Sequence, residues 1–187
     1  MDAFGYLSVL LSIILGLGLT QLLTAIGRLV RHRDRVRVHW LPLLWAALLL
    51  LIYVQVWWSM YGLRLHREWT FLAFSAVLAQ TATLYVMAAV ALPEQVEEAG
   101  ADLGTYFDRH HRWFFAFFLA TLVVSVAKDV ILGGRLPERT NLIFHGVLAV
   151  GCVAGLTMQR RRYQEALGIG FAVAIVTYIG VLFTHLR

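Results

Sequence analysis

The feature that most constrains this chain is a stretch of 23 residues, 4–26, that contains no charged side chain. A helix needs about 20 apolar residues to cross the hydrocarbon core of a bilayer, so this stretch is long enough to span one. Small or hydroxylated residues recur along it at every fourth position: Ser8, Ser12, Gly16, Thr20 and Thr24. Helices in membranes use such residues to approach one another closely. We therefore expect this stripe to face protein and to serve in helix packing.

Five further apolar blocks follow, and each is long enough for a membrane-spanning helix. They cover residues 40–62, 69–92, 113–132, 140–159 and 163–186. Of the 187 residues, 60% are hydrophobic, against about 45–50% in an ordinary soluble domain. The sequence therefore predicts an all-α integral membrane protein, a single domain over residues 1–187 that forms a bundle of six transmembrane helices in a lipid bilayer.

The distribution of arginine predicts how these helices are oriented. Cytoplasmic loops of membrane proteins carry an excess of Lys and Arg. The links after the first, third and fifth helices hold ten arginines, whereas the opposite side holds five. We therefore place the arginine-rich side in the cytoplasm, which puts both termini outside. The expected location is a bacterial inner membrane. The net charge of +5 is explained by this topology, so nucleic acid is not expected as a partner.

The longest polar stretch, residues 93–112, separates the third and fourth apolar blocks. It is acidic at its start, with Glu94, Glu97 and Glu98, and basic at its end. Two glycines, Gly100 and Gly104, weaken any long helix there. We expect a cytoplasmic acidic loop or an interfacial helix that pairs with the basic links beside it.

Two charged residues lie inside the fourth apolar block. Lys128, the chain's only lysine, is followed by Asp129. Charges within a membrane are costly and mark functional sites more often than charges elsewhere. One interpretation is a lysine that reaches the interface and an aspartate paired with Arg135 or Arg139. The other is a place in an ion, proton or ligand pathway. A Schiff base at Lys128, as for a retinal-type chromophore, is a less favoured alternative.

Other polar side chains fall at a similar depth in the remaining helices. They are Ser12, Gln55, His145 and Tyr178. Together with Lys128 and Asp129 they form a predicted layer in the outer half of the bundle. Such groups hold membrane helices together through hydrogen bonds. They also suit a polar cavity open to the outside, which would make the six residues an ion or ligand pathway.

Neither a metal site nor a cofactor is clearly indicated. The seven histidines form no HxxxH or HExxH motif, and the single cysteine, Cys152, excludes a cysteine cluster. The weak candidates for metal ligands are His145, His185 and His66. The cofactor is therefore unknown, with haem and retinal both disfavoured. Gly151 and Gly155 form a GxxxG pair that predicts close helix packing. We also expect a homo-oligomer, in which several copies enclose a cavity.

The leading functional hypothesis is a channel or carrier for an ion or small solute, which Lys128 and His145 would make anionic or proton-coupled. One alternative is a non-catalytic membrane subunit, sensor or interaction protein with a membrane-protein partner. Another is a membrane redox protein with a histidine-ligated cofactor. No catalytic motif is present, so an enzyme is less favoured than a non-enzymatic protein.

Overall fold

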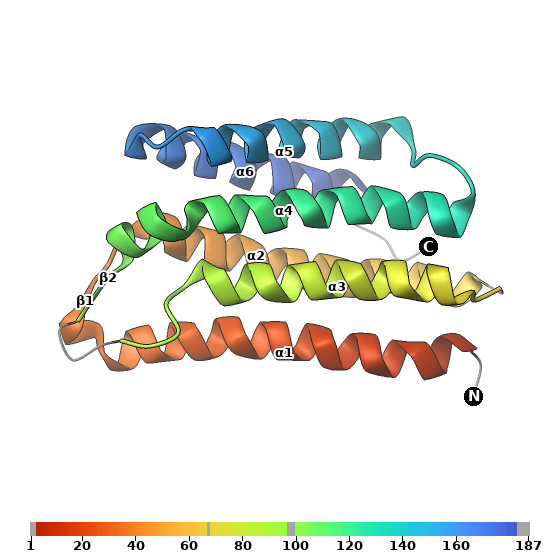
Figure 1. The fold of residues 1–187 in the computed structure, drawn as a ribbon, viewed down its shortest axis with the longest axis horizontal. Coiled ribbons are helices and arrows are strands. Elements are labelled where there is room, and N and C mark those ends of the chain that lie inside the picture. Colours follow the sequence, from red (N-terminus) through yellow and green to blue (C-terminus); the bar gives the residue numbers. More distant parts are fainter. Residues whose placement is uncertain (1–2, 67, 97–99, 183–187) are drawn as a thin grey trace.

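The computed structural model describes residues 3–66, 68–96 and 100–182, and within them the chain forms six long helices (Figure 1). The elements are α1 (Ala3–Arg31), the 3-10 turn η1 (Arg33–Arg35), β1 (Val36–Arg37), α2 (Trp40–Met60), η2 (Tyr61–Leu65), α3 (Phe71–Ala91), β2 (Ala101–Asp102), α4 (Leu103–Gly133), α5 (Arg139–Thr157) and α6 (Arg161–Leu182). All six helices are long and apolar enough to cross a membrane. The predicted all-α bundle is confirmed, and its helices indicate a multi-pass membrane protein.

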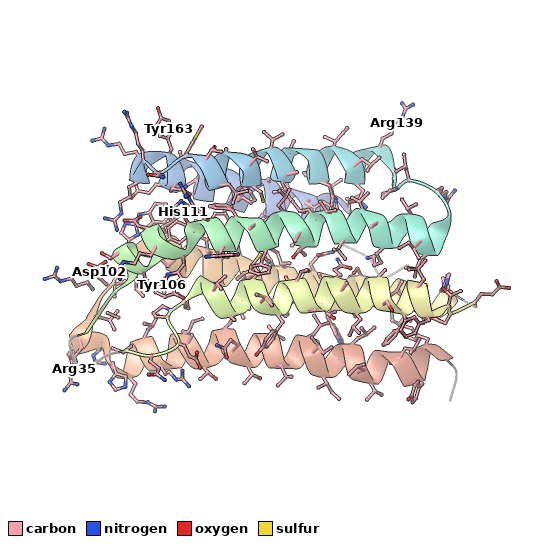
Figure 2. All side chains as sticks on the ribbon, viewed as in Figure 1. Arg35, Asp102, Tyr106, His111, Arg139 and Tyr163 are labelled. Carbon is pink, nitrogen blue, oxygen red and sulfur yellow. The ribbon has the colours of Figure 1, made fainter. Side chains whose placement is uncertain are left out.

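Successive helices run in opposite directions, so the linking segments gather at two ends of the bundle (Figure 1). We call the end with the α1–α2, α3–α4 and α5–α6 links the arginine end. The other end, the opposite end, carries η2 and residues 134–138 between α4 and α5. Arg35 and Tyr163 lie at the arginine end, and Arg139 lies at the opposite end (Figure 2).

Helix α1 lies at the edge of the bundle, against α3 and α2. The side that it buries is a line of mainly large apolar residues spaced at alternating steps of four and three: Leu11, Leu15, Gly18, Leu22, Ala25 and Leu29. This average step of 3.5 residues keeps the line on one side of a helix that supercoils slightly. Gly18 accommodates the side chain of Tyr53 from α2.

The small-residue stripe of α1 points elsewhere. Ser8 is half-buried, and the rest of the stripe, Ser12, Gly16, Thr20 and Thr24, is exposed. No described side chain comes within 4 Å of where a Cβ on Gly16 would lie. The expectation that this stripe joins α1 to the bundle is therefore wrong within the single chain. Steps of four residues drift by about 40° each, so the stripe cannot stay on one neighbour.

Helix α4 begins ten residues earlier than the sequence predicted. The expected segment 93–112 is therefore neither one loop nor a separate helix, because its second half belongs to α4. The extension buries Leu103, Phe107 and His111 on one face. The side chain of Asp102 caps its start by accepting a hydrogen bond from Thr105 N at 2.9 Å. The lack of a side chain at Gly104 leaves room for the Arg161 guanidinium, which explains why glycine is tolerated there.

The acidic and basic links meet through the main chain at the arginine end. Strands β1 and β2 pair in parallel, with Val36 opposite Ala101. Gly100 has φ +93°, and a Cβ there would lie 2.5 Å from the carbonyl oxygen of Arg35. Arg28 also donates to the carbonyl of Glu94. Among the described residues, these links are thus joined by the β1–β2 pairing and by this hydrogen bond from the Arg28 side chain, while Glu97 and Glu98 lie outside the described residues. The ion pairs described at this end are Arg33–Asp34 and His39–Glu165.

A cluster of five aromatic rings fixes the centre of the bundle. This aromatic cluster consists of Trp45 from α2, Phe114, Phe115 and Phe118 from α4, and Phe171 from α6. Ring centroids lie 5.0–6.3 Å from Trp45, and all five side chains are buried. Two glycines of α5 make space for it, because Gly155 lies against Phe115 and Gly151 lies against Phe171.

Replacing Gly155 by alanine should destabilise the protein. The added Cβ would lie 2.5 Å from the ring of Phe115, which is fully buried and has no free space to enter. Overpacking of this kind costs about 1–3 kcal/mol. Gly146→Ala on the same helix is the control, because its Cβ would meet no described atom within 4 Å. Thermal unfolding in detergent should show a lower midpoint for Gly155→Ala alone. Equal midpoints would contradict the packing described here.

Removing the cap of α4 should loosen its first turn. The hydrogen bond from the Thr105 N–H lowers the pKa of the Asp102 carboxyl, so the charged form is the one that caps the helix. The cap is therefore strongest at neutral pH and weakens as the pH falls through this lowered pKa, because the neutral carboxyl is a weaker hydrogen-bond acceptor than the carboxylate. The protection of the amides at residues 104–107 against hydrogen exchange, measured relative to the intrinsic rate at each pH, should fall in Asp102→Ala, and in the wild type on acidification.

Two controls accompany this experiment. Asp102→Asn keeps a capping oxygen, so it should protect these amides without the pH dependence. Asp108→Ala removes an exposed carboxylate from the same helix without touching the cap, and it should leave exchange at residues 104–107 unchanged. Equal acceleration in Asp108→Ala would mean that net charge, and not the cap, controls this turn.

Candidate functional site

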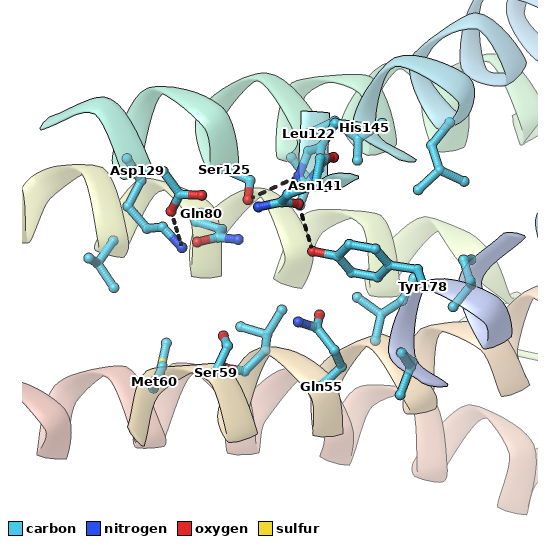
Figure 3. Close-up of a pocket in the computed structure, with 18 of the residues that line it drawn as sticks. Gln55, Ser59, Met60, Gln80, Leu122, Ser125, Asp129, Asn141, His145 and Tyr178 are labelled. Atoms are coloured by element: carbon cyan, nitrogen blue, oxygen red, sulfur yellow. Dashed lines mark hydrogen bonds and ion pairs between the residues drawn. The ribbon is translucent and has the colours of Figure 1, made fainter. Parts of the chain in front are cut away.

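A cavity of about 350 Å³ lies between α2, α3, α4, α5 and α6 (Figure 3). Its polar lining comes from all five helices: Gln55, Ser59, Gln80, Thr121, Ser125, Lys128, Asp129, Asn141, His145 and Tyr178. In Figure 3, Gln55 and Ser59 project from α2 toward the side chains of α4 and α5. No described residue of α1 lines the cavity, because that helix packs on the outer side of α3 and α2.

The structure brings together most of the residues that the sequence placed in one layer. Gln55, Lys128, Asp129, His145 and Tyr178 all line the cavity. Ser12 does not, and this part of the prediction is wrong. The residue has the right depth along its helix, but it lies on the exposed face of α1. Depth can be counted along the sequence, whereas the facing direction depends on which neighbours the helix meets.

The two charged residues of the cavity form an ion pair with each other. The distance from Lys128 Nζ to Asp129 Oδ1 is 3.2 Å, and only 14% and 31% of the two side chains are exposed. The pairing of Asp129 with Arg135 or Arg139 that we considered from the sequence is not the one observed. Breaking this partly buried pair would leave one uncompensated charge, which is unfavourable. The pair thus places opposite charges side by side with no net charge.

A hydrogen-bond network joins the three C-terminal helices across the cavity. His145 Nδ1 lies 2.9 Å from the carbonyl oxygen of Asn141, and this oxygen can only accept, so the ring donates from Nδ1. In the neutral ring, Nε2 is then an acceptor, and it lies 3.3 Å from Ser125 Oγ. Tyr178 donates its hydroxyl to Asn141 Oδ1 at 3.1 Å. Helices α4, α5 and α6 are therefore held in register by this network.

Several lining residues were not among the predicted site residues. Asn141 and Ser125 are bonded to the predicted residues themselves, and Gln80 and Ser59 complete the wall from α3 and α2. A signal for two of them existed in the sequence. Asn141 lies four positions before His145, and Ser125 lies three positions before Lys128, so each shares a helical face with a predicted residue.

The cavity leads to the surface at the opposite end. A wider depression of about 930 Å³, which we call the vestibule, shares Asp129 and Asn141 with the cavity and is also lined by His66, Arg135 and Glu138. On the side of the arginine end, the cavity is lined by Phe118, which belongs to the aromatic cluster. The cavity thus adjoins the vestibule on the side of the opposite end, and it borders the aromatic cluster on the side of the arginine end.

The weak metal candidates do not converge on one site among residues 3–66, 68–96 and 100–182. No group of three His, Cys, Asp or Glu side chains in this part of the chain is placed to hold a metal ion. His145 lines the cavity, whereas His66 lines the vestibule and packs edge-on against Trp69, with ring centroids 5.2 Å apart. His185 lies outside the described residues.

Comparison of the chain with protein-family models, with curated proteins and with solved structures gives no significant match in any of the three.

Water-soluble reagents should reach the cavity from the vestibule. In a background of Cys152→Ala, which removes the one native thiol, Ser125→Cys should react with a small methanethiosulfonate. Ser12→Cys is the matched control, because it lies at a similar depth on the exposed face of α1 and outside the cavity. Measured by mass spectrometry in proteoliposomes, Ser125→Cys should react at least ~10-fold faster. Equal rates would argue that the polar layer is closed to water.

Proposed function

We propose that this chain is a multi-pass membrane protein that carries a small polar solute through the cavity enclosed by helices α2 to α6. The observation that supports this most is the convergence of polar side chains from five apolar helices on one space. Polar and ionisable groups are expensive inside a bilayer and are retained there mainly for function. Interhelical hydrogen bonds alone would not require a cavity of about 350 Å³ beside them.

The aromatic cluster, which forms the floor of the cavity, favours a carrier over a permanently open channel. A channel needs a continuous polar path, whereas here the aromatic cluster occupies the level below the cavity. A carrier exposes its binding site to one side at a time. In this proposal, the described arrangement is the state open toward the vestibule, and transport requires Trp45 and its neighbours to separate.

The direction of access follows from the arginine count. With the arginine end in the cytoplasm, the vestibule faces outward and the solute enters from outside. A bacterial inner membrane, termini on the outer side and a homo-oligomer are parts of the same proposal. Two adjacent members of the exposed stripe of α1, Gly16 and Thr20, suit close contact with a second copy.

The same floor supports a second candidate, a membrane receptor or sensor subunit. A cavity that ends on fully buried rings can bind a ligand and transmit a conformational change to the arginine end. The ligand itself is then not released at that end. The two candidates differ in a measurable way, because only the carrier moves the solute across the bilayer.

Uptake into proteoliposomes tests the proposal. Vesicles with the protein are incubated with a pooled panel of amino acids, sugars, polyols and organic acids, and their contents are measured by mass spectrometry. At least one solute should accumulate in a saturable manner. Lys128→Met and Asp129→Asn should each reduce that uptake at least ~10-fold, because each leaves an uncompensated charge beside the solute. The control is Arg139→Gln, an exposed residue that does not line the cavity.

Binding of a panel member without uptake would instead support the receptor. Uptake that is unaffected by both cavity variants would contradict a pathway through this site.

A further inference from the structure

The charges that line the cavity balance within one residue pair. Lys128 and Asp129 are the charged side chains among its described lining residues, and their atoms are 3.2 Å apart. His145 donates to a carbonyl through Nδ1 and meets a serine hydroxyl through Nε2, so the neutral ring satisfies both contacts. A solute with a single net charge would bring an uncompensated charge into a partly desolvated space, which is costly. The balance favours a solute with no net charge.

An adjacent pair of opposite charges also matches a particular kind of neutral solute. In an α-amino acid, the ammonium and carboxylate groups are attached to the same carbon atom. Placed antiparallel to the protein pair, the carboxylate faces Lys128 Nζ and the ammonium faces the Asp129 carboxylate. Charges of opposite sign then alternate around a closed ring, and each ionic group has a partner. A sugar or polyol can form hydrogen bonds here but leaves the ion pair without this second partner.

The character of the lining changes with depth. Toward the vestibule it is mixed, with Asp129 and Asn141 beside Met60 and Leu63, whereas toward the arginine end it is mainly apolar, with Phe118, Leu122, Met87, Leu148 and Ile175 beside Thr121. Lys128 and Phe118 are ten residues apart on α4, which corresponds to about 15 Å along the helix. A solute whose charged groups stay near the mouth thus has an apolar pocket below them.

We infer that the cavity binds a small zwitterion with an apolar side chain, such as an aliphatic α-amino acid. This inference rests on the proposed function, since it names the class of solute for the same site. The volume supports it, because about 350 Å³ corresponds to about twelve water molecules at ~30 Å³ each and accommodates a leucine-sized molecule. The apolar side chain points toward Leu122 and the apolar lining below it while the ionic groups pair with Lys128 and Asp129.

A panel of matched compounds tests this on the purified wild-type chain in detergent, by calorimetry and thermal shift. L-leucine carries both charges and the side chain. Isopentylamine keeps only the ammonium, 4-methylpentanoate keeps only the carboxylate, and glycine keeps both charges without the side chain. Leucine should bind at least ~10-fold more tightly than each of the three. The inference is overturned if leucine does not bind, or if any of the three binds as tightly as leucine.

Variants locate the interaction within the cavity. Lys128→Met should remove the advantage of leucine over isopentylamine, because the carboxylate then has no cationic partner. Asp129→Asn should remove the advantage of leucine over 4-methylpentanoate, because the ammonium group then has no anionic partner. Arg139→Gln is the control and should keep both preferences. If the preferences for leucine survive in both cavity variants, the assignment of the binding site to this ion pair is overturned. Where a variant fails to fold, the comparison of the four compounds on the wild type still tests the inference.

The uptake assay separates this inference from the proposed function. If leucine fails to bind but another pooled solute is taken up in a Lys128-dependent manner, the carrier stands and the zwitterion is overturned. If leucine binds with the expected preferences but does not enter the vesicles, the zwitterion site is supported and the carrier is overturned.

Discussion

The packing of four phenylalanine rings around Trp45 holds α2, α4 and α6 together at one level of the bundle. In a lipid environment, apolar helices gain little from contact with one another unless they pack closely. The rings provide this contact, and Gly151 and Gly155 let α5 approach them. The same cluster forms the floor of the cavity, so a single packing feature stabilises the bundle and determines where the polar space ends.

Above this floor, several polar side chains pair with one another. The Lys128–Asp129 pair has no net charge, and the network through Ser125, His145, Asn141 and Tyr178 ties three helices together. This compensation allows many polar groups to remain between apolar helices. It also leaves them in pairs that a solute with matching donors, acceptors and charges can join. For the proposed carrier, stability and solute recognition therefore depend on the same side chains.

Helix α1 contributes to the fold in a different way. It adds a line of leucines against α3 and α2 but no described residue to the cavity. Its small residues, including Gly16 and Thr20, lie on the outer face. The helix thus supports the wall of the site from outside, and its exposed stripe is free to meet lipid or another copy of the chain.

The sequence by itself determined six apolar helices and the depth of Lys128 and His145 within them, because hydrophobic length and position along a helix are local properties. It did not determine which face each helix buries. Ser12 has the depth of the cavity residues but points outward, and α4 begins at Leu103 because its buried face and the Asp102 cap continue the helix. The tertiary structure decided the pairing of Lys128 with Asp129, because other residues compete as partners for each charge. It also decided the convergence of five helices on one cavity, because those helices are distant from one another in sequence.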